Sequence, residues 1–528
     1  MEPAEIIPPA LLVPPDAYSR GFHHDDAALV LDGWLRRLAS QQTRCRAVLG
    51  RLAGAFLKRR GQHELGFSRL DDYARERLGL SGRELQSLAT VMGRLDGLPA
   101  LRAAFEAGLR EAGRTPDTGD EDEPRARFHL RCPRRLLALW RDVVELARRM
   151  AGTELTQGQA AEAIAAEGLS AQPSSEEAWP EPLWSPAAPI ADPVETRSAF
   201  AEDLDWSAVA EAIPDEVAWI DRGANHLDPF ALDGRMRRVV QAMQRIDWQT
   251  GRLLRVFLDR RLHRVMQFPS GARYLRERLG ISARKARALV ALERKTWEAP
   301  ILGEAYRAGE LSWVRALAVL PVAREQTAAA WVARGREVTV RRLMDEVEWA
   351  LAARDGSSPI APPPLGATLR DLPERQMCAR EGSEYPDAEI VFSAPVSVVA
   401  LFRTAVLAFA GPGDALWTGF ERLLRHVQAE WEAQPRHRDP IFARDGWRCA
   451  VPACRSRRNL HDHHLLFRSR GGNNGHANRI TICAWHHLRG LHGGRVRAWG
   501  AAPDDVTWEL GVRSGRAPLV RLRGDTYV

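Results

Sequence analysis

Cysteine and histidine residues gather in one short stretch near the C-terminal end of the 528-residue chain. Three of the six cysteines and seven of the fifteen histidines lie within residues 449–492. Cys449 and Cys454 are separated by four residues, and Cys483 and His486 by two, so soft ligands come in two close pairs. Tetrahedral structural zinc needs four such ligands at such spacings. The sequence therefore predicts a structural zinc site made of these four residues.

Between the two pairs lies a second motif: His463-His464 precede a glycine turn and Asn478, and His487 follows the second pair. Over about residues 444–498 this pattern resembles the HNH endonuclease family, also called the His-metal or ββα-metal finger family. In this resemblance His464 takes the place of the first signature histidine, Asn478 that of the asparagine and His487 that of the final histidine. The chain departs from many members by having a histidine, not a fourth cysteine, at the end of its second ligand pair.

The resemblance implies hydrolysis of DNA phosphodiester bonds by a one-metal mechanism that leaves 3′-hydroxyl and 5′-phosphate ends. The reaction needs a base for the attacking water, and positive charge beside the phosphate and the leaving oxygen. A neutral imidazole near pH 7 can be the base, which suits His464. His463 and His487 are the best ligands for a catalytic divalent ion, which could be Mg²⁺, Mn²⁺, Ni²⁺ or Zn²⁺. Asn478 can brace the loop that aims the base.

A third ligand for that ion is expected at His492, which follows His487 by five residues. Five residues turn an α-helix by about 500°, which points the two side chains about 140° apart. Gly490 could end the helix early and let His492 return to the site. His461 shares a strand face with His463, and for it we expect an outer-shell or structural role.

Positive charge concentrates around the same motif. The chain carries a formal net charge of +7, and residues 441–500 hold eleven arginines against two aspartates, a local net of +9. A basic patch in one short domain suggests a polyanionic partner. Arg468, Arg470 and Arg489 flank the predicted site, and we expect them to contact DNA phosphates.

Most of the remaining chain has the composition and periodicity of α-helices, and part of it is duplicated. Residues 51–108 align with residues 252–309 at a constant offset of 201, with 21 identities in 58 positions. Each copy contains Leu-Gly-(Leu/Ile)-Ser, which predicts a glycine-capped helix end followed by a serine N-cap. Helix, tight turn and helix is also the outline of a helix-turn-helix. A packed hairpin and a DNA contact through Arg83 or Arg284 are both compatible with this pattern.

A second unit repeats at an offset of 262, where residues 128–133 match residues 390–395. The whole duplicated region, about residues 46–430, resembles the helical domain of 13E12-repeat proteins. The motifs that carry this resemblance are the Leu-Gly-(Ile/Leu)-Ser sequence, the prolines at positions 99 and 300, and the AAFEAG or EAYRAGELSW that follows them. The resemblance implies an all-helical fold that precedes a C-terminal nuclease domain.

Three runs rich in proline, serine or acidic residues are typical of linkers, at residues 114–125, 171–192 and 355–373. We therefore expect a mainly α fold, in which two copies of a helical domain precede a small zinc-stabilised ββα-metal domain. The expected parts are a partly disordered N-terminal extension (1–45), the first helical copy (46–170), a partly helical linker region (171–240), the second copy with an insert (241–430) and the nuclease domain (431–528).

The chain has no run of about 18 apolar residues, and its N-terminus lacks the basic start and apolar run of a secretory signal. A cytoplasmic protein that acts on DNA without a membrane is therefore expected. The leading hypothesis is a metal-dependent DNA endonuclease with His464 as general base. The alternative is a non-catalytic zinc DNA-binding module, which gives no reason for His463, Asn478 and His487 to occur at nuclease spacing. A purely structural scaffold does not account for the Cys/His motifs.

Overall fold

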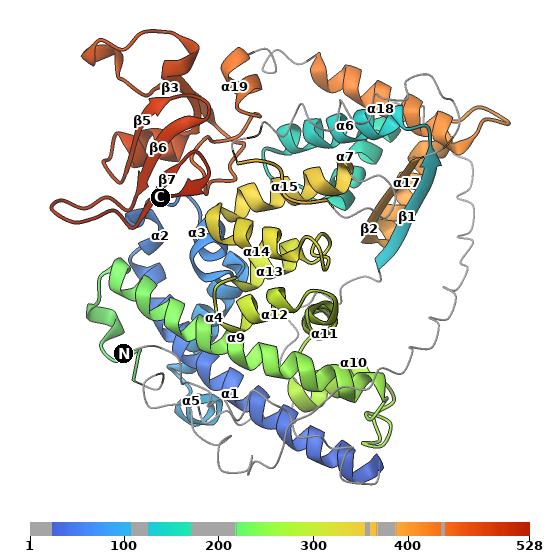
Figure 1. Cartoon of the computed structure of the whole chain (residues 1–528), viewed down its shortest axis with the longest axis vertical. Coiled ribbons are helices and arrows are strands. Elements are labelled where there is room, and N and C mark those ends of the chain that lie inside the picture. Colours follow the sequence, from blue (N-terminus) through green and yellow to red (C-terminus); the bar gives the residue numbers. More distant parts are fainter. Residues whose placement is uncertain are drawn as a thin grey trace.

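A computed structural model describes most of the chain, and it is mainly helical, as predicted (Figure 1). No helix in the described ranges has the length and apolar character needed to cross a membrane. The runs predicted as linkers lie wholly or largely outside these ranges, as does the part of the expected N-terminal extension (1–45) before residue 24, whereas residues 24–45 belong to a helix. The described residues are 24–106, 125–170, 217, 219–353, 360–365, 367, 386, 388–433 and 439–528.

The duplicated sequence folds twice into the same succession of elements. In each copy a π-helical turn ends on a left-handed glycine, Gly79 (φ 65°) or Gly280 (φ 61°). Two residues later Ser81 or Ser282 caps the next helix and accepts a hydrogen bond from the N–H three residues on, as predicted. The elements are α1 (His24–Lys58), α2 (Gly61–Glu64), α3 (Leu70–Tyr73), η3 (Ala74–Leu78), α4 (Gly82–Leu95) and α5 (Pro99–Glu106), then η4 (Ala224–His226), α9 (Pro229–Asp259), α10 (Gly271–Tyr274), η5 (Leu275–Leu279), α11 (Ala283–Glu298) and α12 (Pro300–Arg307).

The long helices α1 and α9 pack together, and each carries a buried aspartate that the other copy satisfies. Asp233 of α9 is only 2% exposed. It accepts hydrogen bonds from the Tyr73 hydroxyl (3.1 Å) and from Arg77 Nη2 (2.6 Å), both in the first copy. A buried carboxylate is tolerated only when charge and hydrogen bonds compensate it. The first copy therefore supplies the hydrogen bonds and the positive charge that compensate the buried Asp233 carboxylate.

The same arrangement recurs with the copies exchanged. Asp32 of α1 is 3% exposed and accepts hydrogen bonds from the Tyr274 hydroxyl (3.0 Å) and Arg278 Nη2 (2.9 Å) of the second copy. All three residues lie 201 positions from their counterparts, the offset of the repeat. We call these two Asp–Tyr–Arg sets the reciprocal clamp. They relate the copies by an approximate two-fold symmetry.

The second repeated unit is also shared between the copies. Strands β1 and β2 pair antiparallel, with Phe128 directly opposite Phe392. Helices from both copies cover this two-stranded sheet, and together they enclose one hydrophobic core around Phe402 and Trp140. The elements are β1 (Arg125–Cys132), α6 (Arg135–Ala151), α7 (Gln157–Ser170), β2 (Ala388–Pro395), α17 (Val396–Ala408) and α18 (Leu416–Glu432).

The insert of the second copy contains three helices, which lie beside α12 and the C-terminal part (Figure 1). With α12 they surround a core of their own, in which Trp331 is fully buried. Its indole N–H donates to the carbonyl of Ile360 (2.9 Å). The helices are α13 (Trp313–Val319), α14 (Ala328–Glu337) and α15 (Val340–Ala353).

The C-terminal part contains two small antiparallel sheets. Strands β3 and β4 pair and are followed by a short helix, which is the order of elements expected from the sequence. A four-stranded meander, β5-β6-β7-β8, follows and was not anticipated. The elements are α19 (Pro440–Arg444), β3 (Leu460–His464), η8 (Arg468–Arg470), η9 (His476–Asn478), β4 (Arg479–Cys483), η10 (His486–Leu491), β5 (Val496–Ala501), β6 (Asp505–Leu510), β7 (Val520–Arg523) and β8 (Thr526–Tyr527).

The C-terminal part packs directly on the helices. It shares one hydrophobic core with the first repeated unit of both copies. An antiparallel bridge joins Val338, just before α15, to Thr526 in β8. Ion pairs to the helical part are formed by Arg448 with Asp345, Arg455 with Asp71, Arg457 with Glu145 and Glu154, and Arg495 with Glu64. The Cys/His region is therefore held from several sides.

We predict that Asp233→Ala lowers the free energy of unfolding by about 3–5 kcal/mol, because it leaves Arg77 and the Tyr73 hydroxyl buried without their partner. Asp32→Ala should cost a similar amount, since the clamp is reciprocal. Urea unfolding followed by circular dichroism measures both. The control is Asp96→Ala, which removes an exposed pair with Arg102 and should cost less than about 1 kcal/mol. Equal midpoints for Asp233→Ala and the control would contradict the role of the clamp.

Candidate metal centres

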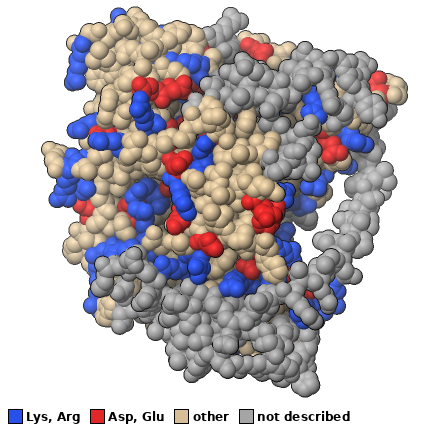
Figure 2. All heavy atoms as spheres, in the orientation of Figure 1, with Lys and Arg blue, Asp and Glu red and all other residues tan. Residues whose placement is uncertain are grey.

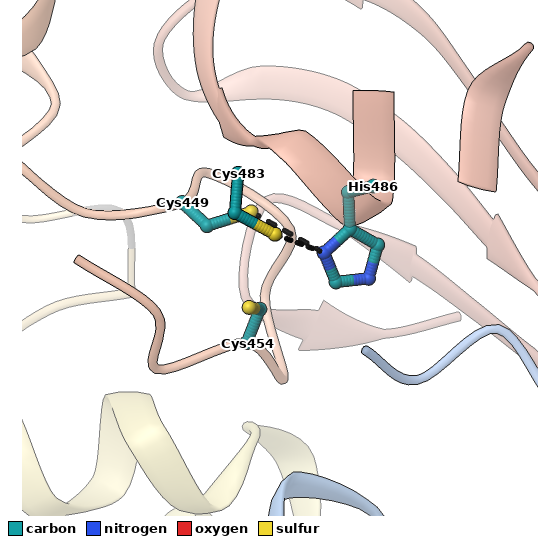
Figure 3. A group of neighbouring side chains, drawn as sticks. All are labelled: Cys449, Cys454, Cys483 and His486. Carbon is teal, nitrogen blue, oxygen red and sulfur yellow. Dashed lines mark hydrogen bonds between the residues drawn. The ribbon is translucent and has the colours of Figure 1, made fainter. Parts of the chain in front are cut away.

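Four side chains converge on one point in the C-terminal part (Figure 3). Cys449 and Cys454 come from the segment before β3, Cys483 ends β4, and His486 begins η10. All four are buried, and their ligand atoms lie within 4.8 Å of one another. His486 Nδ1 is 3.4 Å from Cys449 Sγ and 3.3 Å from Cys483 Sγ. The structure thus brings together the four residues predicted as zinc ligands.

This donor set fits zinc. With Zn–S near 2.3 Å and Zn–N near 2.0 Å, tetrahedral sulfur and nitrogen ligands lie about 3.5 Å apart. The two S···N distances are close to that value. Burial raises the pKa of the Cys449 thiol well above its ordinary value, and a nearby dication would favour the thiolate. The Cys₃His cluster could therefore hold a metal ion such as zinc.

Residues of the helical part contact this cluster from outside. His486 Nε2 lies 3.2 Å from the carbonyl oxygen of Gly66. When Nε2 donates its proton to this oxygen, Nδ1 keeps the lone pair that a metal ligand needs. Ser68 Oγ lies 3.4 Å from Cys454 Sγ. Arg341 Nη1 donates to three carbonyl oxygens of the Cys449–Cys454 loop at 2.8 to 3.0 Å. The helices thus help to fix the geometry of the cluster.

A second group consists of His463 on β3, His487 in η10 and His492 directly after it, with ligand atoms within 4.8 Å of one another. The expected early helix end at Gly490 does not occur. Instead η10 is a π-helix, and the His492 N–H donates to the His487 carbonyl (3.1 Å). In a π-helix hydrogen bonds join residues five positions apart, so residues 487 and 492 lie near one another on one side of the helix. This wider turn is what brings His492 to the site.

The surroundings of His463 and His487 favour the neutral form of these two imidazoles. Burial and the neighbouring histidines 487, 492 and 464 lower the pKa of His463 to about 4. Burial and the imidazoles of His461 and His492 lower the pKa of His487 as well. A neutral imidazole has the lone pair that coordination requires. His461 lies outside the group, with its Nδ1 2.8 Å from His487 Nδ1. If His487 donates this bond, its Nε2 is free to bind an ion.

His464, the predicted base, lies beside this group on β3. Its Nε2 is 2.9 Å from Asn474 Oδ1. In the neutral tautomer that donates this hydrogen bond, Nδ1 has a lone pair. Asn478, the predicted brace, accepts from the Leu466 N–H (2.7 Å). Its amide also donates to the carbonyls of Leu466 (3.1 Å) and Asn473 (2.8 Å). Asn478 thus holds both ends of the loop that follows His464.

The eleven arginines of the basic segment divide into two sets. Eight of them contact acidic side chains or backbone carbonyls. On the face of the whole molecule drawn in Figure 2, acidic side chains likewise lie among the basic ones. Arg468, Arg470 and Arg489 are exposed and form no ion pair within the described ranges. Most of the local positive charge is therefore engaged in internal contacts. The three arginines without a described ion pair flank the second group in sequence, and Arg470 among them lies over the ring of Phe467 (5.5 Å). The eight are Arg444, Arg448, Arg455, Arg457, Arg458, Arg479, Arg495 and Arg497.

Four residues that contact the Cys₃His cluster or His464 were missed in the sequence. Asn474, which contacts His464, could have been found from its place in the polar, glycine-rich loop directly after Gly471-Gly472. Nothing in the sequence pointed to Gly66, Ser68 or Arg341, because they belong to the helical part. The Gly66 contact spans 420 positions of sequence. Only the folded arrangement of the two copies brings such residues to the cluster.

No protein-family model, curated protein sequence or solved structure matches this chain. The two Cys/His groups and their surroundings are therefore the basis on which a function can be proposed.

We predict that Cys454→Ser abolishes stoichiometric zinc binding by the purified full chain and lowers its thermal midpoint, because a bound structural zinc stabilises a fold by about 10 kcal/mol. Elemental analysis after dialysis measures the zinc, and calorimetry measures the midpoint. Cys45→Ala is the matched control, since Cys45 is buried at 1% exposure in the helical core, away from the cluster. A variant at Cys454 that keeps its zinc and its midpoint would contradict the metal assignment.

Proposed function

We propose that the chain is a metal-dependent DNA endonuclease of the HNH type. The observation that carries this proposal is the position of His464, which directly follows the candidate ligand His463 in β3 and whose Nε2 contacts Asn474, so that Nδ1 of the neutral ring could act as the base. A base beside a cation site is the arrangement that hydrolysis of a phosphodiester requires. Arg468, Arg470 and Arg489, which are exposed and have no described ion pair, supply positive charge for the DNA backbone.

In this proposal each residue has a separate task. His464 Nδ1 takes the proton of the attacking water, while Asn474 holds the ring through Nε2. A divalent ion held by the three-histidine group would stabilise the charge on the phosphate and on the leaving oxygen. Asn478 keeps the intervening loop in place through its three hydrogen bonds. The neutral state of His463 and His487 suits them to ligand roles rather than to phosphate contact.

The second candidate is a non-catalytic zinc DNA-binding module. The buried Cys₃His cluster favours it, because that cluster alone could stabilise the C-terminal part and present Arg468, Arg470 and Arg489 to DNA. It gives no reason for the second set of imidazoles, which lies outside the cluster. Cutting, as opposed to binding, distinguishes the two candidates.

We predict that His464→Ala slows the nicking of supercoiled plasmid by about 10²–10⁴-fold, because it removes proton abstraction. DNA affinity at fixed salt should persist, since it rests on arginine–phosphate contacts. His463→Ala should instead weaken binding of the catalytic ion, so added divalent metal should partly restore its nicking. The same addition should not rescue His464→Ala.

The matched control is His476→Ala, because His476 is an exposed histidine of η9 in the same loop region and belongs to neither group. It should nick like the wild type. If His464→Ala also nicks like the wild type, the base has been misassigned. If the wild type binds DNA but cuts nothing with Mg²⁺, Mn²⁺, Ni²⁺ or Zn²⁺, the binding-module candidate replaces the endonuclease.

A further inference from the structure

The four-stranded sheet β5–β8 has one face in the hydrophobic core and one face open to solvent. Val496, Trp508 and Leu522 point inward and are at most 2% exposed. The residues that alternate with them must point outward, because successive side chains of a strand alternate between faces. None of the tasks assigned above uses this outward face.

A tryptophan lies on the outward face, in line with an arginine. Trp499 of β5 is opposite Thr507 of β6, and Thr507 is opposite Arg523 of β7. Residues directly opposite one another share a face of the sheet. The Trp499 side chain is therefore in the same row as Arg523, whose side chain is 66% exposed. Among the described residues Arg523 forms one ion pair, with Asp505, an exposed carboxylate that a phosphate could replace.

The neighbouring row on this face is basic and borders a hollow of about 480 Å³. Arg497 and Arg521 lie on either side of Glu509, which is 5% exposed and pairs with both. Arg516 also lines the hollow. Three guanidinium groups thus face one buried carboxylate, which leaves positive charge for an anionic ligand.

Trp499 differs from the other exposed tryptophans of the described chain. Trp219 and Trp297 are 47% and 44% exposed, and an arginine covers the ring of each. Trp499 is 46% exposed, and no described cation or ring stacks on it. A large flat apolar surface left uncovered beside arginines is the combination that proteins use to bind unpaired nucleotides.

Strand β5 is joined to the proposed nuclease site at both ends. It follows η10, which carries His487, after a turn of a few residues. Just beyond its other end the Ala502 N–H donates to the carbonyl of Ala477 (2.8 Å), next to Asn478 in η9. A nucleic acid held at the site could therefore continue onto the sheet.

We propose that the outward face of β5–β8 binds unpaired nucleotides of DNA, with one base stacked on Trp499 and the backbone held by Arg497, Arg516, Arg521 and Arg523. Inside a duplex both faces of a base are covered by its neighbours, so a stacking platform selects unpaired bases. The inference rests on the proposed function in taking DNA as the substrate. It adds that the preferred DNA contains a single-stranded segment.

The test is equilibrium binding of the full chain to a labelled single-stranded DNA of about 16 nucleotides, the upper end of the site size of one small binding domain. Fluorescence anisotropy without added divalent metal measures the affinity. Trp499→Ala should weaken binding roughly 5- to 100-fold, and Trp499→Phe should retain most of it, because both effects follow from stacking. Trp297→Ala, at matched exposure, should bind like the wild type. Arg523→Glu should weaken binding and reduce its dependence on salt.

Binding by Trp499→Ala equal to that of the wild type, or no binding by the wild type, overturns this inference. Tighter binding of an RNA of the same sequence overturns the assignment to DNA. Plasmid nicking separates the two proposals. A wild type that nicks plasmid but fails these binding tests loses only the sheet-face site. A wild type that binds through Trp499 and cuts nothing loses only the endonuclease.

Discussion

One buried carboxylate in each copy of the helical repeat takes its described hydrogen bonds from the other copy, and the packing of the two copies depends on this exchange. Asp32 and Asp233 are almost completely buried. Without the tyrosine and arginine of the partner copy, either would be an uncompensated buried charge, which costs several kcal/mol. The antiparallel pairing of β1 with β2 repeats this dependence in the second unit. The duplicated halves therefore fold around shared cores, which form the surface that receives the Cys/His region.

The contact between the helical copies and the C-terminal segment explains why the charge of that segment gave only part of the picture of its partners. The sequence showed eleven arginines in one stretch, which is typical of a polyanion partner. Four of them pair with acidic residues far away in sequence, as Arg448 does with Asp345 and Arg457 does with Glu145. Composition cannot reveal such pairs, because they exist only after the helical copies are in place. The arginines without a described ion pair are Arg468, Arg470 and Arg489, which flank the second histidine group in sequence.

Short-range patterns were predictable from the sequence, and long-range ones were not. The helical class, the glycine and serine caps and the gathering of the Cys₃His residues depend on spacings of a few positions, and the structure shows all of them. An α-helical turn would have pointed His492 away from His487, whereas the chain forms a π-helix there that brings the two together. Such π-helical turns are rare, so the α-helix was the expected geometry. Strands β5–β8 were missed because they are short, with six, six, four and two residues, so their alternation of apolar and polar side chains extends over few positions.

The metal cluster and the helical scaffold are coupled, because the outer contacts of the cluster come from the scaffold. Gly66 orients His486, and Arg341 holds the carbonyls of the cysteine loop. Such contacts set the tautomer and position of a ligand, and their loss typically weakens metal binding 10- to 100-fold. The two Cys/His groups share β4 and η10, since Cys483 and His486 precede His487 directly. A disturbance of the helical copies would therefore pass through the Cys₃His cluster to the three-histidine group. Proper packing of the repeats is thus a condition for the chemistry proposed at His464.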